Sequence, residues 1–209
     1  NPDKELLHES LRTEIERALE QGRMVLHYQP QYDLRRDRIV GAEALVRWRQ
    51  ADGKVILPET FIRVAEQSGL IRQLSEWIIG TACRELAMLK EHHPGLRVGI
   101  NLSMHNLHDR DLAEQIGRSL ASHRLDPGSL LLEITETGVM LDPDQVIETL
   151  DELSGMGLKL TIDDFGTGHS SLAYLKRLPI NALKIDRTFV KDMVENEQDS
   201  IIVRSTVGL

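Results

Sequence analysis

The residues best suited to chemistry in this chain are two adjacent aspartates, Asp163 and Asp164, followed by a Gly-Thr-Gly segment at 166–168. Neighbouring side chains at a strand end point in different directions, so both carboxylates reach one cavity only if the backbone bends, and the glycines permit a bend. Two unpaired carboxylates held close raise one another's pKa, and a divalent cation removes this conflict. An isolated Asp-Asp pair before glycine is more commonly a solvated turn, so the other strands must decide between the two interpretations.

Strand and helix patterns alternate along the chain and predict the scaffold that carries this pair. Strands are expected at 24–32, 39–48, 97–103, 130–135, 159–163 and 182–186, and helices at 58–66, 70–92, 112–122, 142–154, 171–177 and from 197 to the end. Repeated strand–helix units favour a parallel sheet covered by helices. A doubly wound fold would carry a glycine-rich turn after its first strand, but residues 30–33 are Pro-Gln-Tyr-Asp. A barrel instead places functional side chains at the carboxyl ends of several strands.

Side-chain alternation within the predicted strands supports the barrel. From the second strand onward, one parity is apolar and the other carries a charged or metal-ligating residue, namely Glu43, Asn101, Glu133, Asp163 and Lys184. Each residue taken alone fits an ordinary role, such as an ion pair between Glu43 and Arg47 or an Asx turn at Asn101. Agreement across five strands favours a shared interior site, because unmatched charges facing a barrel interior cost several kcal/mol each.

A metal site built on this parity would use oxygen donors. The candidate ligands are Glu43, Asn101, Glu133, Asp163 and Asp164. Carboxylate and amide oxygens select hard cations such as Mg²⁺ or Mn²⁺ over Zn²⁺, and the sequence does not rank one of these two ions above the other.

Size and composition restrict the remaining classes of protein. The 209 residues, 41% hydrophobic and 28% charged, are typical of a soluble globular chain, and no segment approaches the ~18 apolar residues of a membrane span. A net charge of −8 without a dense basic stripe argues against a binder of duplex nucleic acid. Cys83 is the single cysteine, which excludes an internal disulfide and fits a reducing compartment. We therefore expect a cytoplasmic domain, whether or not the whole protein is tethered to a membrane.

Two regions are expected along the chain. Residues 1–22 form an amphipathic helix that either packs on the domain or connects it to an upstream module, and residues 23–209 form one barrel domain. The first residues, Asn-Pro-Asp-Lys-Glu, lack Met and lack the basic and then apolar pattern of a signal peptide. We therefore expect a longer protein with an upstream sensory or regulatory domain.

Six short motifs follow one another along the chain. They are Tyr28-Gln29-Pro30, Glu43-Ala44-Leu45, Asn101-Leu102-Ser103, Glu133-Ile134-Thr135-Glu136, Asp163-Asp164-Phe165-Gly166-Thr167-Gly168 and Lys184-Ile185-Asp186. Glu-Ala-Leu alone is weak because such tripeptides arise by chance, but the ordered set spans nearly the whole chain. The set resembles the EAL-domain family of bacterial phosphodiesterases, which hydrolyse the second messenger cyclic di-GMP.

The resemblance implies a modified TIM (β/α)₈ barrel with one reversed strand, and hydrolysis of cyclic di-GMP to linear pGpG at a site with two Mg²⁺ or Mn²⁺ ions. The first ion would be held by Glu43, Asn101, Glu133 and Asp163. Asp163 would bridge to the second ion, with Asp164 on that side. The implied catalytic residues are Glu43, Asp164 and Lys184, where Lys184 positions the attacking water or offsets developing charge.

The resemblance also implies contacts beyond the metals. The substrate-binding positions match Gln29, Leu45, Arg47 and Asp186. Glu136 matches a residue that anchors the loop after the fifth strand. Family members commonly dimerise through the barrel mouth near that loop, so a homodimer is implied as well.

Two features depart from the family's pattern. His169 stands where the family usually has Tyr, and we interpret it as a turn residue, with metal ligation or pH sensing as the alternatives. The family also continues with two more strands, which carry the remaining Glu of the second metal site and a substrate-binding Gln. These strands are absent from a chain that stops at Leu209, and we expect them to lie beyond that residue.

Two other functions stay open on the sequence. A non-catalytic module that binds cyclic di-GMP as a sensor is the main alternative, because the last metal-binding Glu is not among these residues. An unrelated barrel hydrolase with two carboxylates, such as a glycosidase, is less favoured, because aromatic residues make up only 4% of the chain.

Overall fold

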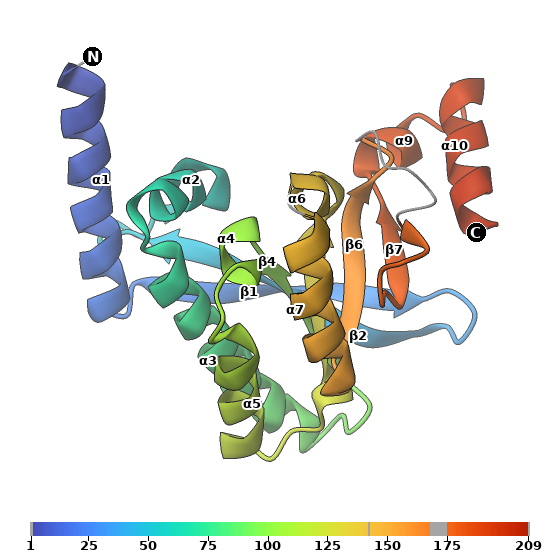
Figure 1. The fold of residues 1–209 in the computed structure, drawn as a ribbon, viewed down its shortest axis with the longest axis horizontal. Helices are drawn as coiled ribbons and strands as arrows, with labels where there is room; N and C mark the ends of the chain where they lie inside the picture. Colours follow the sequence, from blue (N-terminus) through green and yellow to red (C-terminus); the bar gives the residue numbers. More distant parts are fainter. Residues whose placement is uncertain (1, 142, 168–174, 209) are drawn as a thin grey trace.

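The computed structural model describes residues 2–141, 143–167 and 175–208, which form one mixed sheet with helices packed against it (Figure 1). Within these residues the sheet has seven strands in the order β1-β2-β4-β5-β6-β7, and β3 pairs with β2. The strands are β1 (Met24–Asp33), β2 (Arg38–Arg49), β3 (Val55–Ile56), β4 (Arg97–Leu102), β5 (Leu130–Thr135), β6 (Lys159–Phe165) and β7 (Ala182–Ile185). All six predicted strands are present with ends shifted by one or two residues at most, and only the short β3 was not predicted.

Strand direction matches the expected barrel. β1 runs antiparallel to β2, whereas β2, β4, β5, β6 and β7 run parallel to one another. Along the path from β1 to β7, β1 is therefore the reversed strand that the resemblance implied, and the two-residue β3 off this path also pairs antiparallel with β2. Parallel strands bring their carboxyl ends to one edge of the sheet, so polar side chains near those ends gather there.

The helices are α1 (Pro2–Glu20), α2 (Pro58–Ser68), α3 (Ile71–Lys90), α4 (Met104–Leu107), α5 (Leu112–Ser122), α6 (Glu136–Leu141), α7 (Pro143–Gly155), α9 (Arg187–Lys191) and α10 (Glu197–Val207), with a 3-10 turn, η1, at Pro127–Ser129. α2 begins with proline in its first turn and ends at Gly69, whose φ of 77° is the left-handed conformation that favours glycine.

The predicted helix at 142–154 corresponds to α7. A separate helix, α6, precedes it and was not predicted. Most of the predicted helix at 171–177 lies outside the described residues.

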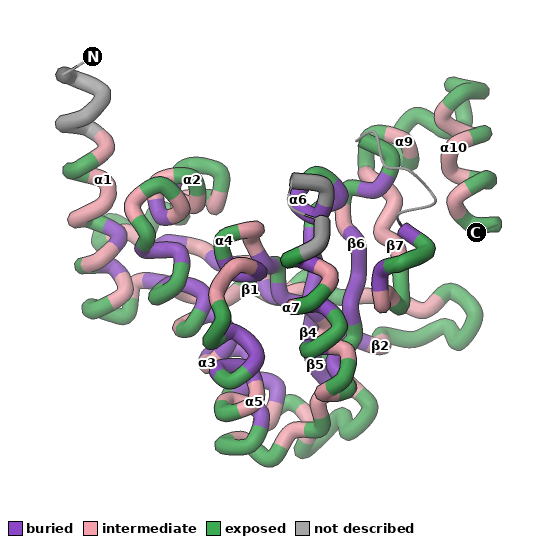
Figure 2. Tube along the Cα trace, in the orientation of Figure 1, coloured by how far each residue is buried: buried purple, intermediate pink, exposed green. Residues whose placement is uncertain are grey.

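The apolar parity of the strands packs under the helices. Ala44, Ile100, Leu132 and Leu160 from four neighbouring strands are all 3% exposed or less. An apolar stripe on α3 is also buried, with Leu74, Ala82 and Leu86 at 0% exposure and Ile78 at 8%. Figure 2 shows buried positions concentrated along the strands, with exposed positions on the outer sides of the helices.

α1 packs against the domain. Ile15 and Ala18 are fully buried, and a ring nitrogen of His8 lies 2.8 Å from Oε1 of Gln67 on α2. Gly22, with a φ of 64°, follows the helix in the left-handed conformation that favours glycine. The packing shows that α1 lies on the domain surface in this structure, beside α2 (Figure 1).

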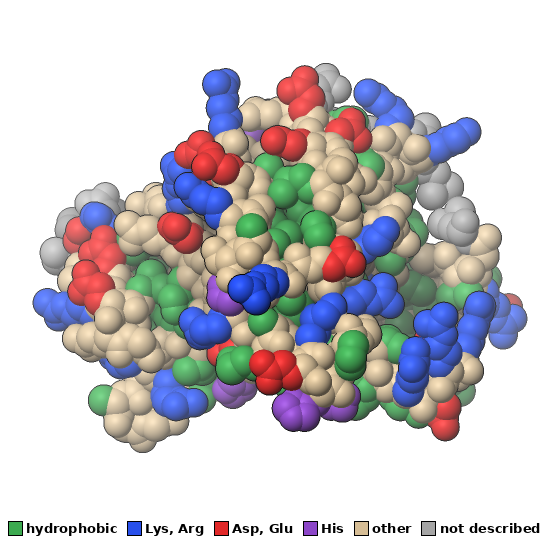
Figure 3. Space-filling model, turned by 90° about the horizontal axis from the view of Figure 1, so that it is seen from below, with side chains coloured by type: hydrophobic (Ala, Val, Ile, Leu, Met, Phe, Trp, Pro, Cys, Tyr) green, Lys and Arg blue, Asp and Glu red, His purple; other side chains and the backbone are tan. Residues whose placement is uncertain are grey.

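The surface carries both signs of charge. Seen from below, Lys and Arg side chains are interspersed with Asp, Glu and apolar side chains (Figure 3). Among the described residues, no helix combines the length and the apolar character that crossing a membrane requires.

Candidate metal and catalytic site

Three carboxylates from three strands come together on the polar parity of the sheet. Glu43 on β2, Glu133 on β5 and Asp163 on β6 each place one carboxylate oxygen within 4.8 Å of the other two. Glu43 and Asp163 are partly buried, and Glu133 is only 1% exposed. Strand alternation predicted that these side chains face the same way, and the structure brings them into one cluster.

Lys184 on β7 lies at the centre of this cluster. Its Nζ donates hydrogen bonds to Glu43 Oε2 at 2.9 Å, to Glu133 Oε2 at 2.6 Å and to Asp163 Oδ2 at 2.8 Å. Burial alone would lower the pKa of Lys184, but the hydrogen bonds to Asp163, Glu133 and Glu43 outweigh it and raise the pKa above its usual value. The lysine therefore stays charged at neutral pH.

Glu133 is the most perturbed acid of the site. Burial raises the pKa of Glu133 to about 7, although its hydrogen bond to Lys184 acts in the opposite direction. The charges of Glu43 and Asp163 add to the rise. A buried carboxylate crowded by two others is costly to ionise, and a bound cation offsets that cost.

The cluster fits a hard divalent cation. Its donors are carboxylate oxygens, and three carboxylates against one ammonium leave an excess of negative charge when all are ionised. Glu43, Glu133 and Asp163 would hold such a cation, and because the same three carboxylates bind Lys184 Nζ, metal and ammonium would compete for them. The fit rests on the chemistry of the donor set.

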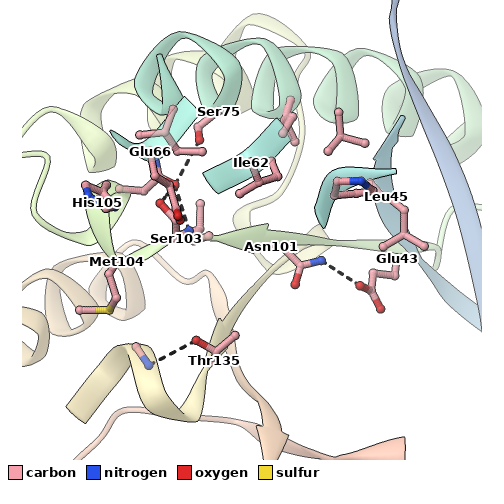
Figure 4. Close-up of a pocket in the computed structure, with 18 of the residues that line it drawn as sticks. Glu43, Leu45, Ile62, Glu66, Ser75, Asn101, Ser103, Met104, His105 and Thr135 are labelled. Atoms are coloured by element: carbon pink, nitrogen blue, oxygen red, sulfur yellow. Dashed lines mark hydrogen bonds between the residues drawn. The ribbon is translucent and has the colours of Figure 1, made fainter. Parts of the chain in front are cut away.

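Asn101 on β4 joins the cluster through Glu43. Its Nδ2 donates a hydrogen bond to Glu43 Oε1 at 2.8 Å, and Figure 4 shows the two side chains directed toward each other. This bond leaves the amide oxygen pointing away from Glu43. The structure thus places Asn101 beside the three carboxylates, with an oxygen of the predicted type.

Asp164 lies outside the three-carboxylate group. Its φ of 53° is in the left-handed region, so the backbone bends at Asp164 itself and the pairing register of β6 with β7 shifts between Ile162 and Phe165. Its amide N–H donates to Asp163 Oδ1 at 2.9 Å. Burial, the charge of Asp163 and the neighbouring Asp186 raise the pKa of Asp164.

Asp186 begins the short helix α9. Its Oδ1 accepts a hydrogen bond from the amide of Thr188 at 2.7 Å, and it also accepts one from the Thr188 hydroxyl. The hydroxyl and amide of Thr188 lower the pKa of Asp186. The pKa values of Asp164 on β6 and of Asp186 directly after β7 thus shift in opposite directions. Asp164 holds a proton more readily than usual, and Asp186 holds one less readily.

A cavity of about 630 Å³ opens beside Glu43 and Asn101. Leu45, Ile62 on α2 and Met104 on α4 are among the residues that line it, and they make its wall largely apolar (Figure 4). Leu45 was expected to touch substrate, and it lines this cavity together with Glu43 and Asn101. The helical side of the cavity was not foreseen, because no spacing along the sequence relates these helices to the strands.

Two other expected substrate residues flank the cluster on β1 and β2. Gln29 is exposed and pairs in register with Glu43 across the β1–β2 ladder. Arg47 is partly buried, and its Nη1 donates to the carbonyl oxygen of Val46 at 2.8 Å.

Glu136 connects the start of α6 to the turn after the aspartate pair. Its side chain is 3% exposed, and Oε2 accepts a hydrogen bond from the Gly166 amide at 2.8 Å. The fifth predicted strand, 159–163, is β6, and an anchor of the loop after it would make such a contact. His169, the departure from the family's pattern, lies outside the described residues.

Gln31 is a residue of the site that the sequence motifs did not indicate. Gln31 Nε2 lies 3.4 Å from Glu133 Oε1, although the two residues are on strands separated by β2 and β4. The available signal was its parity, since Gln31 lies two residues after Gln29 and points to the same side of β1.

The chain is similar to known proteins over nearly its whole length. Residues 12–209 match the family model of the EAL domain. The chain is 40% identical over 206 residues to the bifunctional diguanylate cyclase/cyclic di-GMP phosphodiesterase MucR of Pseudomonas aeruginosa, covering 98% of this chain and 29% of MucR. It is also 40% identical over 197 residues to the cyclic di-GMP phosphodiesterase NbdA of the same species, covering 94% of this chain and 25% of NbdA. The chain thus spans under a third of these relatives.

Solved structures show the same fold. The structure of the PaMucR phosphodiesterase in complex with c-di-GMP superposes with a TM-score of 0.90 at 40% identity, covering 95% of this chain and 81% of that chain. The FimX EAL domain of Pseudomonas aeruginosa bound to c-di-GMP gives a TM-score of 0.86 at 27% identity, covering 95% of this chain and 79% of that chain. With a family model that matches residues 12–209, the chain belongs to the EAL domain family, whose fold is a modified TIM barrel.

Proposed function

We propose that this domain is a metal-dependent phosphodiesterase that hydrolyses cyclic di-GMP to linear pGpG. The observation that carries the proposal is the cluster of Glu43, Glu133 and Asp163 around Lys184 in a chain of the EAL domain family. The names of two relatives, MucR and NbdA, include cyclic di-GMP phosphodiesterase activity, and this supports the same substrate here.

The cofactors we propose are two Mg²⁺ or Mn²⁺ ions. The ligands of the first would be Glu43, Asn101, Glu133 and Asp163, and Asp163 would be shared with a second ion on the side of Asp164. When bound, such ions polarise a phosphoryl oxygen and make a nearby water acidic enough to attack at neutral pH. The all-oxygen donor set supports this choice of metal.

Lys184 would contribute a fixed positive charge. Because its pKa is raised by three carboxylates, it stays protonated over the physiological range. The ammonium would orient the attacking water or offset the negative charge that develops on the phosphoryl oxygens. A preorganised charge of this kind acts most strongly in a partly buried site.

The substrate would lie across the cluster and the neighbouring cavity. Arg47 carries a forked guanidinium suited to phosphate, and one of its five N–H donors is engaged by the Val46 carbonyl in this structure. Leu45 and the apolar cavity wall suit the flat face of a guanine. Gln29 and Asp186 would add hydrogen bonds, and Glu136 would hold the loop that follows β6 through Gly166.

Assembly belongs to the proposal as well. The curated relatives are three to four times longer than this chain, which supports an upstream sensory or regulatory domain reached through α1. We propose a homodimer formed near the loop that Glu136 contacts. Light scattering of the active protein tests this, and full activity in a species that is purely monomeric would refute it.

The decisive experiment incubates the full-length protein with cyclic di-GMP and Mg²⁺ or Mn²⁺ and follows pGpG by chromatography. The expected result is metal-dependent product, which is lost in Glu43→Ala while circular dichroism stays unchanged. Binding of cyclic di-GMP without any turnover would refute the enzyme and favour the sensor. Unchanged turnover in Glu43→Ala would refute the metal site.

A further inference from the structure

The two oxygens of the Glu133 carboxylate contact residues on two different strands, β7 and β1. Glu133 Oε2 accepts from Lys184 on β7 at 2.6 Å, and Oε1 lies 3.4 Å from Nε2 of Gln31 on β1. These two strands are the first and last in the sheet order among the described residues. One oxygen is thus directed into the cluster, and the other is directed toward β1.

Two glycines leave room for the Gln31 and Glu133 side chains to meet across the sheet. A Cβ on Gly99 of β4 would lie 2.4 Å from Glu133 Oε1 and 3.1 Å from its Cδ. A Cβ on Gly41 of β2, the register partner of Gln31, would lie 2.9 Å from the Arg97 carbonyl oxygen on β4 and 3.0 Å from Gln31 Oε1. Neither glycine has a left-handed φ, so space and not backbone conformation explains why a side chain is missing. A glycine inside a strand commonly marks such a close approach.

Because Glu133 is buried, losing the contact with Gln31 would leave one of its carboxylate oxygens without a donor. Glu133 is 1% exposed, so solvent offers little replacement for a lost donor at Oε1. A buried acceptor without a donor is unfavourable, and the carboxylate would rotate to find another partner. Rotation would turn Oε2 away from the centre of the cluster, where Glu43 and Asp163 also place an oxygen.

We propose that Gln31 is a positioning residue for the metal site, and that Gly99 provides the passage through which it acts. Gln31 retains Glu133 Oε1, so that Glu133 ligates through Oε2 alone and in a fixed direction. Groups that orient ligating carboxylates tune metal affinity without touching the metal. The inference rests on the metal site of the proposed function, but it does not depend on which substrate is cleaved.

The test measures Mn²⁺ affinity in the full-length protein by electron paramagnetic resonance of free Mn²⁺. Gln31→Met keeps the length of the side chain and removes the donor, and it should weaken Mn²⁺ binding by about 10–100-fold. Gly99→Ala should weaken it as well, because Glu133 is a flexible side chain that moves aside from the new Cβ. The controls are Gln73→Met, exposed on α3, and Gly80→Ala, where a Cβ meets nothing within 4 Å. Both controls should change the affinity by less than about twofold.

A double variant distinguishes positioning from general damage. Because Gln31 and Gly99 act through one carboxylate, Gln31→Met with Gly99→Ala should bind Mn²⁺ about as weakly as the weaker single variant. If the losses of Mn²⁺ affinity in the two single variants add in the double variant, Gln31 and Gly99 do not act through one carboxylate, and the shared mechanism is overturned. If folded Gln31→Met binds Mn²⁺ with the affinity of wild type, the proposal is overturned. If Gly99→Ala does not fold, the result for Gln31→Met decides by itself.

The outcome is separable from that of the proposed function. A wild-type protein that binds Mn²⁺, responds to Gln31→Met and yet makes no pGpG would refute the phosphodiesterase and support the positioning role. A wild-type protein that binds no Mn²⁺ would overturn both.

Discussion

Replacing Lys184 with Met is the perturbation that most sharply probes the balance of charge in the site. The ammonium is the counter-ion of Glu43, Glu133 and Asp163, at 2.6 to 2.9 Å from each. Removing one member of a buried ion-pair network costs about 3–5 kcal/mol, and the 30% exposure of the Lys184 side chain places the expected cost at the lower end, about 3 kcal/mol. For a domain of this size, that loss lowers Tm by about 6–12 °C.

The assay is thermal unfolding followed by circular dichroism, once with EDTA and once with saturating Mn²⁺. In EDTA, Lys184→Met should melt well below wild type. With Mn²⁺ the gap should narrow, because the variant has no ammonium to displace from the carboxylates and gains more from the metal. The exposed Lys176→Met is the matched control, with no expected change in either condition. Equal melting of Lys184→Met and wild type in EDTA, or a gap that Mn²⁺ leaves unchanged, would refute the reasoning.

Two further predictions concern buried acids. Between pH 4.5 and 7 the metal-free protein should lose up to about 3 kcal/mol of stability through Glu133, because the folded chain keeps this proton up to a pKa of about 7 and the unfolded chain releases it near 4.5. Comparing the free energy of unfolding in urea of wild type and Glu133→Gln at several pH values isolates this contribution. If wild type gains stability relative to Glu133→Gln as pH rises, the predicted direction is wrong. Glu136→Ala should leave the Gly166 amide without its acceptor, cost about 1–3 kcal/mol and speed hydrogen exchange at that amide, whereas Glu136→Gln keeps an acceptor oxygen and should lose less. Equal exchange in wild type and Glu136→Ala would show that Glu136 does not hold this turn.

Strand alternation carried most of the site prediction. Because side chains in a strand alternate and parallel strands end at one edge, the sequence alone assigns Glu43, Glu133 and Asp163 to one face. The structure places them together with Lys184. The reversed direction of β1 came from the family resemblance and not from the alternation pattern.

Other features depend on distances that the sequence does not encode. Gln31 reaches Glu133 across two intervening strands, and this requires both the sheet order and the room above Gly99. Asp164 was expected on the side of a second ion, and that role stays a prediction. Its left-handed φ and its approach to Asp186 are local features that the sequence does not encode. The α6 helix before α7 was missed because it is short and follows a strand directly, with no turn residue between them to signal a break.

The central claim is that the carboxylate cluster holds metal and that this metal drives hydrolysis of cyclic di-GMP. The most direct measurement titrates Mn²⁺ into metal-free protein and records bound Mn²⁺ and the rate of pGpG formation on the same sample. We predict that the two rise together and that both are lost in Asp163→Asn. Turnover at its full rate in excess EDTA, or Mn²⁺ binding in Asp163→Asn equal to that of wild type, would contradict the claim.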